Sequence, residues 1–190
     1  VPKVYRGNPE GVFVVVMAGM EIGLTPLRAL NGFVPIGGGL AMKADLQLAV
    51  VRRSGALAFF DEGFELAGQT DNNLAERIAR NSRDDDERAA LAGIAETILD
   101  LSDDVPQGKP YGWAIAQRRG DHQKHVRVFT FNDAENFKTT AWEGNQKVEG
   151  KLSEKAAYKN NPQDMYPKRA RVRVLSVTHS DVLMGMPAVE

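Results

Sequence analysis

The residues best suited to chemistry in this sequence are four cations within six positions, just after Pro167: Lys168, Arg169, Arg171 and Arg173. Like charges this close repel one another unless a counter-charge neutralises them, and a phosphate backbone does so with release of counterions. The alternative is the solvated face of an ordinary helix, and charge alone does not separate the two. The cluster therefore indicates a polyanion as a candidate partner.

Two further groups of cations could contribute to such a site. Lys43, Arg52 and Arg53 follow the first predicted hairpin and could line the same groove, although arginines at the end of a helix often interact only with its carbonyl groups and its dipole. The weaker group lies around the turn of the second predicted hairpin and consists of Arg118, Arg119 and Lys124.

Metal chemistry is a competing interpretation. Asp121, His122 and His125 offer ligands, but across a hairpin turn the two rings need not converge, and Lys124 would oppose a cation. The acids at 84–87 could also bind a divalent metal, yet adjacent side chains at the start of a helix diverge around its axis. A metal-dependent nuclease built on either group stays as an alternative function.

Composition limits the remaining possibilities. With 190 residues, 43% of them hydrophobic, the chain can form one domain with a substantial core. The absence of cysteine excludes disulfides and thiolate zinc sites and favours a reducing compartment. The longest apolar run, 12–20, is too short to span a bilayer. A chain that opens on Val1 without a signal peptide is expected to be part of something longer.

The net charge of −1 conceals an asymmetry along the chain. Residues 1–106 carry 10 Lys and Arg against 16 Asp and Glu, whereas residues 107–190 carry 14 against 9. Local potential matters more than the total, because the Debye length at physiological salt is about 8 Å. The second part therefore remains able to bind a polyanion.

The first half of the chain predicts alternating short helices and strands. Asn8 and Pro9 begin a helix over 11–22, although the run Val14 to Val16 favours a strand. The glycines at 37–39 predict a tight hairpin between 32–36 and 40–42, and no Lys-Ser/Thr pair follows them as in a phosphate-binding loop. The other predicted elements are a helical turn at 25–30, an amphipathic helix at 43–55 that places Leu46, Ala49 and Val50 on one face, and a strand at 57–66.

The segment 68–108 differs in character because it is acidic and alanine-rich. Asp84, Asp85, Asp86 and Glu87 open a helical pattern and suit the positive end of its dipole. We interpret the segment as an insertion that faces away from nucleic acid, with 1–67 and 109–190 forming one core domain. Its removal is therefore expected to leave DNA binding intact.

The second half predicts another hairpin, from 110–116 and 124–131, and a short helix from Asn132. The cationic stretch 168–174 alternates so strictly that its periodicity alone predicts a strand with one basic face. These elements belong to an α+β fold.

The order of these elements resembles the RecT family of phage-type single-strand DNA annealing proteins. The resemblance rests on the segments 20–30, 43–46, 51–55, 158–165, 168–171 and 181–186. Their order and spacing carry it jointly, over most of the chain outside 68–108. Ser176 and Ser180 depart from the pattern, because many relatives have arginine at the first position and proline is common at the second.

The resemblance implies a compact core of β-hairpins and helices that assembles into rings or helical filaments. It also implies that the protein is not an enzyme and uses no cofactor: single-stranded DNA lies in a basic groove, and the complementary strand anneals without ATP. The expected partners are single-stranded and annealed duplex DNA, other copies of the chain and an exonuclease, with no membrane. The expected place is the cytoplasm of a bacterial host cell.

The resemblance also favours a helix over 165–177. On that helix Lys168, Arg169 and Arg173 share one face and would contact phosphate, with Arg169 the strongest contact. Ala170, Val174 and Val177 lie opposite, and Arg171 points between the faces. Tyr158 and Tyr166 flank the basic element as stacking or core groups. A structural phage oligomer, using the apolar helix 11–22 as its interface, is a further alternative.

Overall fold

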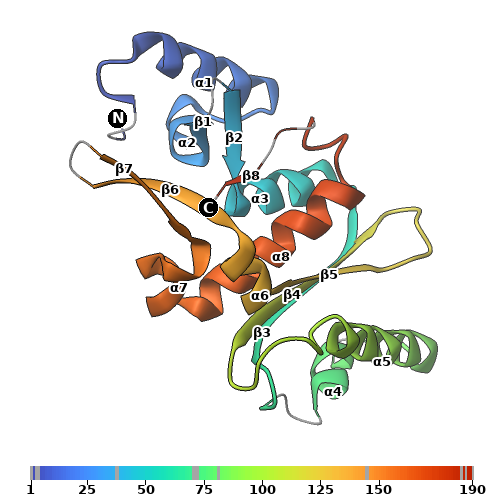
Figure 1. Ribbon diagram of the computed structural model, residues 1–190. Helices are drawn as coiled ribbons and strands as arrows, with labels where there is room; N and C mark the ends of the chain where they lie inside the picture. Colours follow the sequence, from blue (N-terminus) through green and yellow to red (C-terminus); the bar gives the residue numbers. More distant parts are fainter. Residues whose placement is uncertain are drawn as a thin grey trace.

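The computed structural model describes residues 2, 5–36, 39–69, 73–80, 82–143, 146–184, 186, 188 and 189. Its architecture is α+β, as predicted: helices pack around small sheets whose strands are antiparallel except for one short parallel pair (Figure 1). The N-terminal helices lie at one end of the molecule and the segment 74–100 lies at the other.

The first helix, α1 (Pro9–Glu21), begins where the sequence predicts. The Asn8 side chain accepts a hydrogen bond from the Gly11 amide and Pro9 occupies the first turn. The helix ends before Gly23, which has a φ of +67°. α2 (Pro26–Gly32) crosses α1 where Gly19 meets Ala29; a Cβ on Gly19 would lie 2.3 Å from the Ala29 Cβ. Burial against α2 therefore outweighs the β-propensity of the valine run.

The first sheet contains the predicted hairpin, β1 (Phe33–Ile36) and β2 (Gly39–Lys43). Of the turn glycines, Gly37 and Gly38 lie outside the described residues. The strand β8 (Ala188–Val189) pairs parallel to β2 and brings the end of the chain to this sheet.

The helix α3 (Ala44–Ser54) follows β2 directly and ends at Gly55, whose φ is +73°. The helix was predicted correctly, but its buried face differs from the predicted one. Ala49 is exposed and Leu46 half-buried, whereas Gln47, Leu48 and Val51 join Val50 and Ala44 in the interior.

The central sheet orders the strands β3 (Leu57–Leu66), β4 (Pro110–Arg118) and β5 (His125–Thr130), and its two faces are different. On one face of β4, Tyr111, Trp113 and Ile115 are buried in one hydrophobic cluster; on the other face Ala114 and Ala116 belong to a second cluster. The last long helix, α8 (Pro162–Thr178), packs on this second face.

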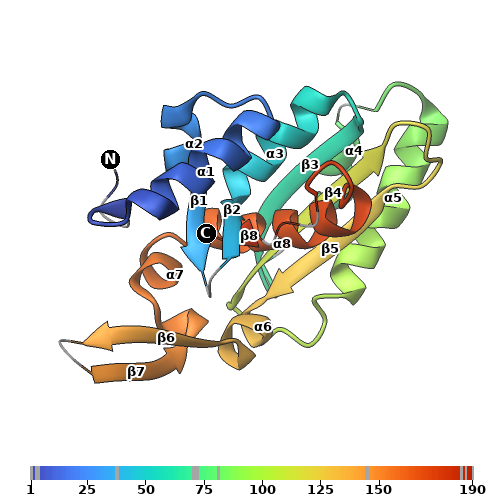
Figure 2. The ribbon, with the colours of Figure 1, turned by 90° about the horizontal axis from the view of Figure 1, so that it is seen from above.

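The predicted acidic segment forms α4 (Leu74–Ala79) and α5 (Asp85–Asp100), and the Asp84 side chain caps α5 by accepting from the Glu87 amide. These helices cover the first face of the central sheet: Leu91, Ala95 and Ile98 pack in the same cluster as Trp113. The segment is thus a layer of the fold with a shared core, as its position in Figures 1 and 2 also shows.

The chain then forms the predicted short helix α6 (Phe131–Asn136), followed by a hairpin that the sequence did not reveal, β6 (Lys138–Glu143) and β7 (Gln146–Lys151). This hairpin extends away from the rest of the molecule in both views (Figures 1 and 2). A 3-10 turn (Leu152–Glu154) and α7 (Ala156–Asn160) connect it to α8.

The cationic stretch is helical, so the periodicity was misleading and the helix expected from the resemblance is confirmed. Ala170 and Val174 are buried as predicted, but Val177 is 55% exposed, so its predicted place in the packed face is wrong. Val177 therefore lies on the exposed side of the last turn of α8, which ends at Thr178.

One finding concerns membranes. Among the described residues no single helix is long and apolar enough to cross a bilayer; α1 and α2 meet that criterion only as a pair bent by 108°.

Candidate nucleic-acid interface

Arg171, which the sequence predicts to point between the two faces of α8, is buried in the structure. Its side chain is 9% exposed and lies between two other elements. Nε and Nη2 donate to the Glu62 carboxylate on β3 at 2.8 and 2.5 Å, and Nη1 donates to Asp45 Oδ1 on α3 at 2.6 Å. A buried arginine with two carboxylate partners ties α8 to β3 and α3 and offers no surface for phosphate.

The two predicted neighbours of Arg169 on the basic face are partly exposed, and both contact acids. Arg173 forms a two-bond ion pair with Asp133 of α6 at 2.9 and 3.1 Å. Burial opposes ionisation of Asp133, but the Arg173 guanidinium and the hydrogen bonds from Thr130 together outweigh it and lower the pKa of Asp133. Lys168 Nζ lies 3.6 Å from Asp45 Oδ2.

Arg169, the predicted strongest contact, lies among aromatic rings. Its Nε donates to the Tyr158 hydroxyl at 2.9 Å, and its guanidinium carbon is 5.0 Å from the centroid of Phe137 and 6.0 Å from that of Phe129. Tyr158 and Tyr166 are both buried in the core, and burial raises the pKa of Tyr166 to about 12. The two tyrosines are therefore core groups, not stacking platforms.

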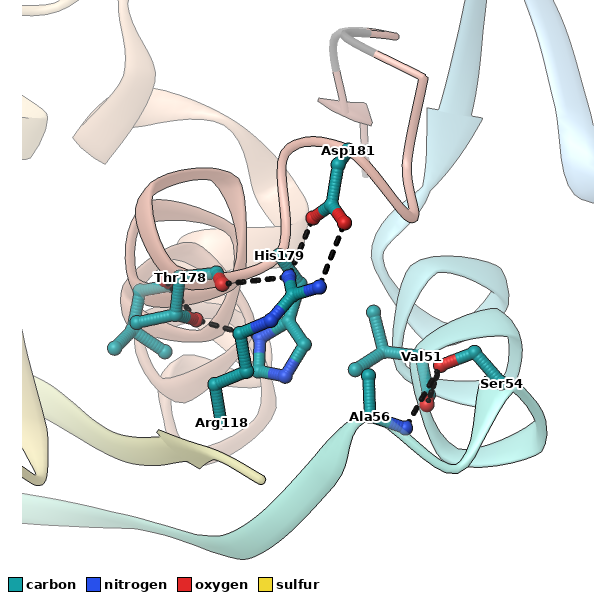
Figure 3. Close-up of polar contacts among 8 residues, drawn as sticks. Val51, Ser54, Ala56, Arg118, Thr178, His179 and Asp181 are labelled. Atoms are coloured by element: carbon teal, nitrogen blue, oxygen red, sulfur yellow. Dashed lines mark hydrogen bonds and ion pairs between the residues drawn. The ribbon is translucent and has the colours of Figure 1, made fainter. Parts of the chain in front are cut away.

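The third predicted group of cations is dispersed. Figure 3 shows Arg118 reaching from the end of β4 to Asp181, with two hydrogen bonds of 2.5 and 2.7 Å. This guanidinium holds the pKa of Asp181 down at about 2. Lys124 pairs with Glu87 at 3.2 Å and lies over the Phe59 ring, in the layer formed with α5. Arg119 is exposed at the turn.

Lys43, Arg52 and Arg53 take different positions around α3. Arg52 lies over the Phe60 ring at 5.7 Å. Arg53 donates to the Gly23 carbonyl at 3.0 Å and so reaches back toward α2. Lys43, the last residue of β2, is exposed.

Lys43 and Arg53 line a hollow between α2 and α3 with a volume of about 700 Å³. We call it the α2–α3 hollow. It is lined by Leu24, Arg28, Asn31, Gly32, Lys43, Asp45, Leu46, Ala49, Val50 and Arg53. Arg28 is a cation that the sequence analysis missed. Pro26 marks the start of the short helix α2 in the sequence. Arg28 is the third residue of that helix and is exposed.

The α2–α3 hollow is electropositive. Three cations, Arg28, Lys43 and Arg53, face one carboxylate, Asp45. Burial opposes ionisation of Asp45, but Arg171 and Lys168 outweigh it and lower its pKa, so its charge is already neutralised from the α8 side. Lys168 thereby adjoins the hollow through Asp45.

The metal interpretation finds no cluster to support it. Across the described residues, no group of three or more His, Cys, Asp or Glu side chains is arranged to hold an ion. His125 Nε2 lies 3.2 Å from Asp121 Oδ2. At the start of α5, Asp84 accepts a hydrogen bond from the Glu87 amide, and Glu87 pairs with Lys124.

Comparison with known proteins gives no relative. No model of a known protein family matches the chain, and no curated protein or solved structure is significantly similar to it.

Proposed function

We propose that this protein binds single-stranded DNA and anneals complementary strands without ATP, as a homo-oligomer. The observation that carries the proposal is the α2–α3 hollow, where Arg28, Lys43 and Arg53 from three elements face a common space. Phosphate binding there needs no nucleotide or metal, because the cations themselves neutralise the backbone.

The cations of the hollow are better placed for a polyanion than those of α8. Arg28 and Lys43 are exposed, and neither has an ion-pair partner within the described part of the chain. Lys168 adjoins the hollow on α8, but like Arg171 and Arg173 it already meets a carboxylate, which would compete with phosphate.

The proposal also agrees with the resemblance noted in the sequence. Segments 20–30, 43–46 and 51–55, on which the resemblance rests, contain the three cations of the hollow. Sequence-independent binding follows, because phosphates carry no base information.

The test is a strand-annealing assay with labelled complementary oligonucleotides, in EDTA and without nucleotide. We expect annealing by the unmodified protein. Lys43→Ala and Arg28→Ala should each weaken binding to strands of any sequence and lower the slope of log affinity against log salt by roughly 0.7. Arg88→Ala, an exposed arginine on α5, is the matched control and should change neither quantity.

An absolute requirement for ATP would overturn the annealing mechanism. Unchanged binding in a Lys43→Ala/Arg28→Ala double variant would remove the hollow from the site. In that case the same measurements on Lys168→Ala and Arg169→Ala decide whether α8 alone holds the strand, as the sequence predicts.

A further inference from the structure

Phe137 has an exposed aromatic ring and lies outside the α2–α3 hollow. Among the side chains that the structure describes, two aromatic rings belong to the exposed class, Phe13 at 65% and Phe137 at 46%. Phe13 lies on the apolar helix α1, whereas Phe137 joins α6 to β6. The two rings differ in what lies against them.

Phe137 ends a series in which cations and rings alternate. The Arg173 guanidinium carbon is 4.7 Å from the centroid of the buried Phe129, Arg169 lies 6.0 Å from Phe129, and Arg169 lies 5.0 Å from Phe137. Arginine planes and aromatic rings attract one another through the ring quadrupole. The series starts in the core and ends at a ring that water reaches.

Hydrogen bonds fix the backbone that carries this ring. The Phe137 amide donates to the Asp133 carbonyl at 2.9 Å, and its carbonyl accepts from the Leu152 amide at 3.0 Å. Arg169 is itself fixed by its bond to the buried Tyr158 hydroxyl. A flat surface held this firmly loses little conformational entropy when a second flat group stacks on it.

The charge next to the ring is suitable for a nucleotide. Lys138 lies directly opposite Lys151 across the β6–β7 pair, an arrangement of like charges that is unfavourable unless something neutralises them. Glu135 neutralises Lys151 at 2.7 Å. Lys138 is exposed, and the described residues give it no ion-pair partner. A phosphate beside the ring would supply the missing charge.

We propose that Phe137 is a base-stacking position for single-stranded DNA, with Lys138 contacting the phosphate of the stacked nucleotide. The inference rests on the proposed function and adds to it a contact with the bases. Stacking on an aromatic ring tolerates every base because each has a π-face, so the contact is compatible with sequence-independent binding.

The test uses a single-stranded oligonucleotide that contains 2-aminopurine, whose fluorescence falls when it stacks. We expect quenching by the unmodified protein and by Phe137→Trp, and loss of quenching with Phe137→Leu, which keeps an apolar side chain but has no ring. Affinity should fall about 5- to 150-fold in Phe137→Leu and Phe137→Ala, the range expected for one stacked base.

The salt dependence separates stacking from charge. Phe137→Leu should leave the slope of log affinity against log salt unchanged, because the ring carries no charge, whereas Lys138→Ala should lower it by roughly 0.7. Phe13→Leu is the matched control, an exposed phenylalanine with no cation–ring contact among the described residues, and should match the unmodified protein in every readout.

Three outcomes are decisive. Quenching and affinity that survive in Phe137→Leu overturn the inference and leave the proposed function intact. A protein that binds no single-stranded DNA at all removes both. An equal loss in Phe13→Leu and Phe137→Leu shows a general effect of removing surface rings and also rejects the stacking position.

Discussion

Arg171 stabilises the fold, although the sequence suggested that it belongs to the DNA-binding site. It lies on α8 and binds Glu62 of β3 and Asp45 of α3, so it connects α8 to two consecutive elements that lie 109 and 126 residues earlier in the chain. The neighbouring cations are held less completely, since Lys168 and Arg173 keep about a third of their side-chain surface exposed. Burial, rather than charge, therefore distinguishes structural from available cations in this cluster.

Replacing Arg171 with alanine should destabilise the protein strongly. The change leaves Glu62 without its partner in a partly buried position, which costs about 3 kcal/mol in the free energy of unfolding. Urea denaturation measures this value. Arg119→Ala, an exposed arginine, is the control and should stay within about 0.5 kcal/mol of the unmodified protein. A silent Arg171→Ala variant would contradict the described ion pairs.

The pair between Arg118 and Asp181 should make stability depend on acid pH. The pKa of Asp181 is about 2 in the folded protein, below the value of about 3.9 for an unfolded chain. Its contribution is therefore fully present above about pH 4 and is lost as the pH falls toward about 2. Asp181→Asn should lower the urea midpoint at pH 6 and have no effect near pH 2. An equal effect at both pH values would contradict this assignment.

At the scale of the elements, α8 packs closely against β4 because Gly112 of β4 has no side chain. A Cβ on Gly112 would lie 2.2 Å from the Tyr166 carbonyl carbon and 2.3 Å from the Pro167 nitrogen. Both are backbone atoms of α8, and they cannot move without shifting the helix. The small residues of β4 therefore set how closely α8 approaches the central sheet.

Gly112→Ala should consequently destabilise the protein by about 1–3 kcal/mol, because overpacking forces a shift of the helix. The matched control is Gly93→Ala on α5, where an added Cβ meets nothing within 4 Å. That change should stabilise by about 0.5–1 kcal/mol through helix propensity. Thermal unfolding of both variants measures the difference, and equal melting temperatures would show that α8 packs less tightly than described.

The sequence predicts elements well where local signals decide them. Asn8 with Pro9, the positive-φ glycines and Asp84 all mark boundaries that the structure confirms. The sequence does not predict features that depend on contacts between distant elements. The alternating cations of α8 favoured a strand because the sequence does not show that Arg171 packs against acids of β3 and α3. The α2–α3 hollow depends on how two helices pack. No local sequence pattern predicts the β6–β7 hairpin or the exposure of Phe137 either.

At the scale of the whole molecule, the layer α4–α5 cannot be treated as an appendage. Its helices share a hydrophobic cluster with Tyr111, Trp113 and Ile115 of the central sheet. The sequence alone led to the expectation that 68–108 can be removed without loss of DNA binding. The packing leads to the opposite expectation for the fold.

We therefore expect a variant that lacks 68–108 to lose cooperative unfolding and to expose the aromatic face of β4, detected by dye binding and circular dichroism. A milder change tests the electrostatic role separately. Asp100→Asn and Asp103→Asn are exposed substitutions that preserve the layer and should strengthen DNA binding slightly at low salt. A folded, fully active deletion variant would show that the layer is dispensable.

The position of this layer also makes the charge distribution of the molecule asymmetric. Residues 68–108 carry 10 acidic against 4 basic side chains, and the helices α4 and α5 of this segment cover the face of the central sheet opposite α8. The cations of the α2–α3 hollow lie on the α8 side, so the charge separation amounts to a permanent electric dipole across the sheet. The electric field of a polyanion would orient such a molecule before contact. The charge distribution would therefore affect the association rate more than the lifetime of the complex.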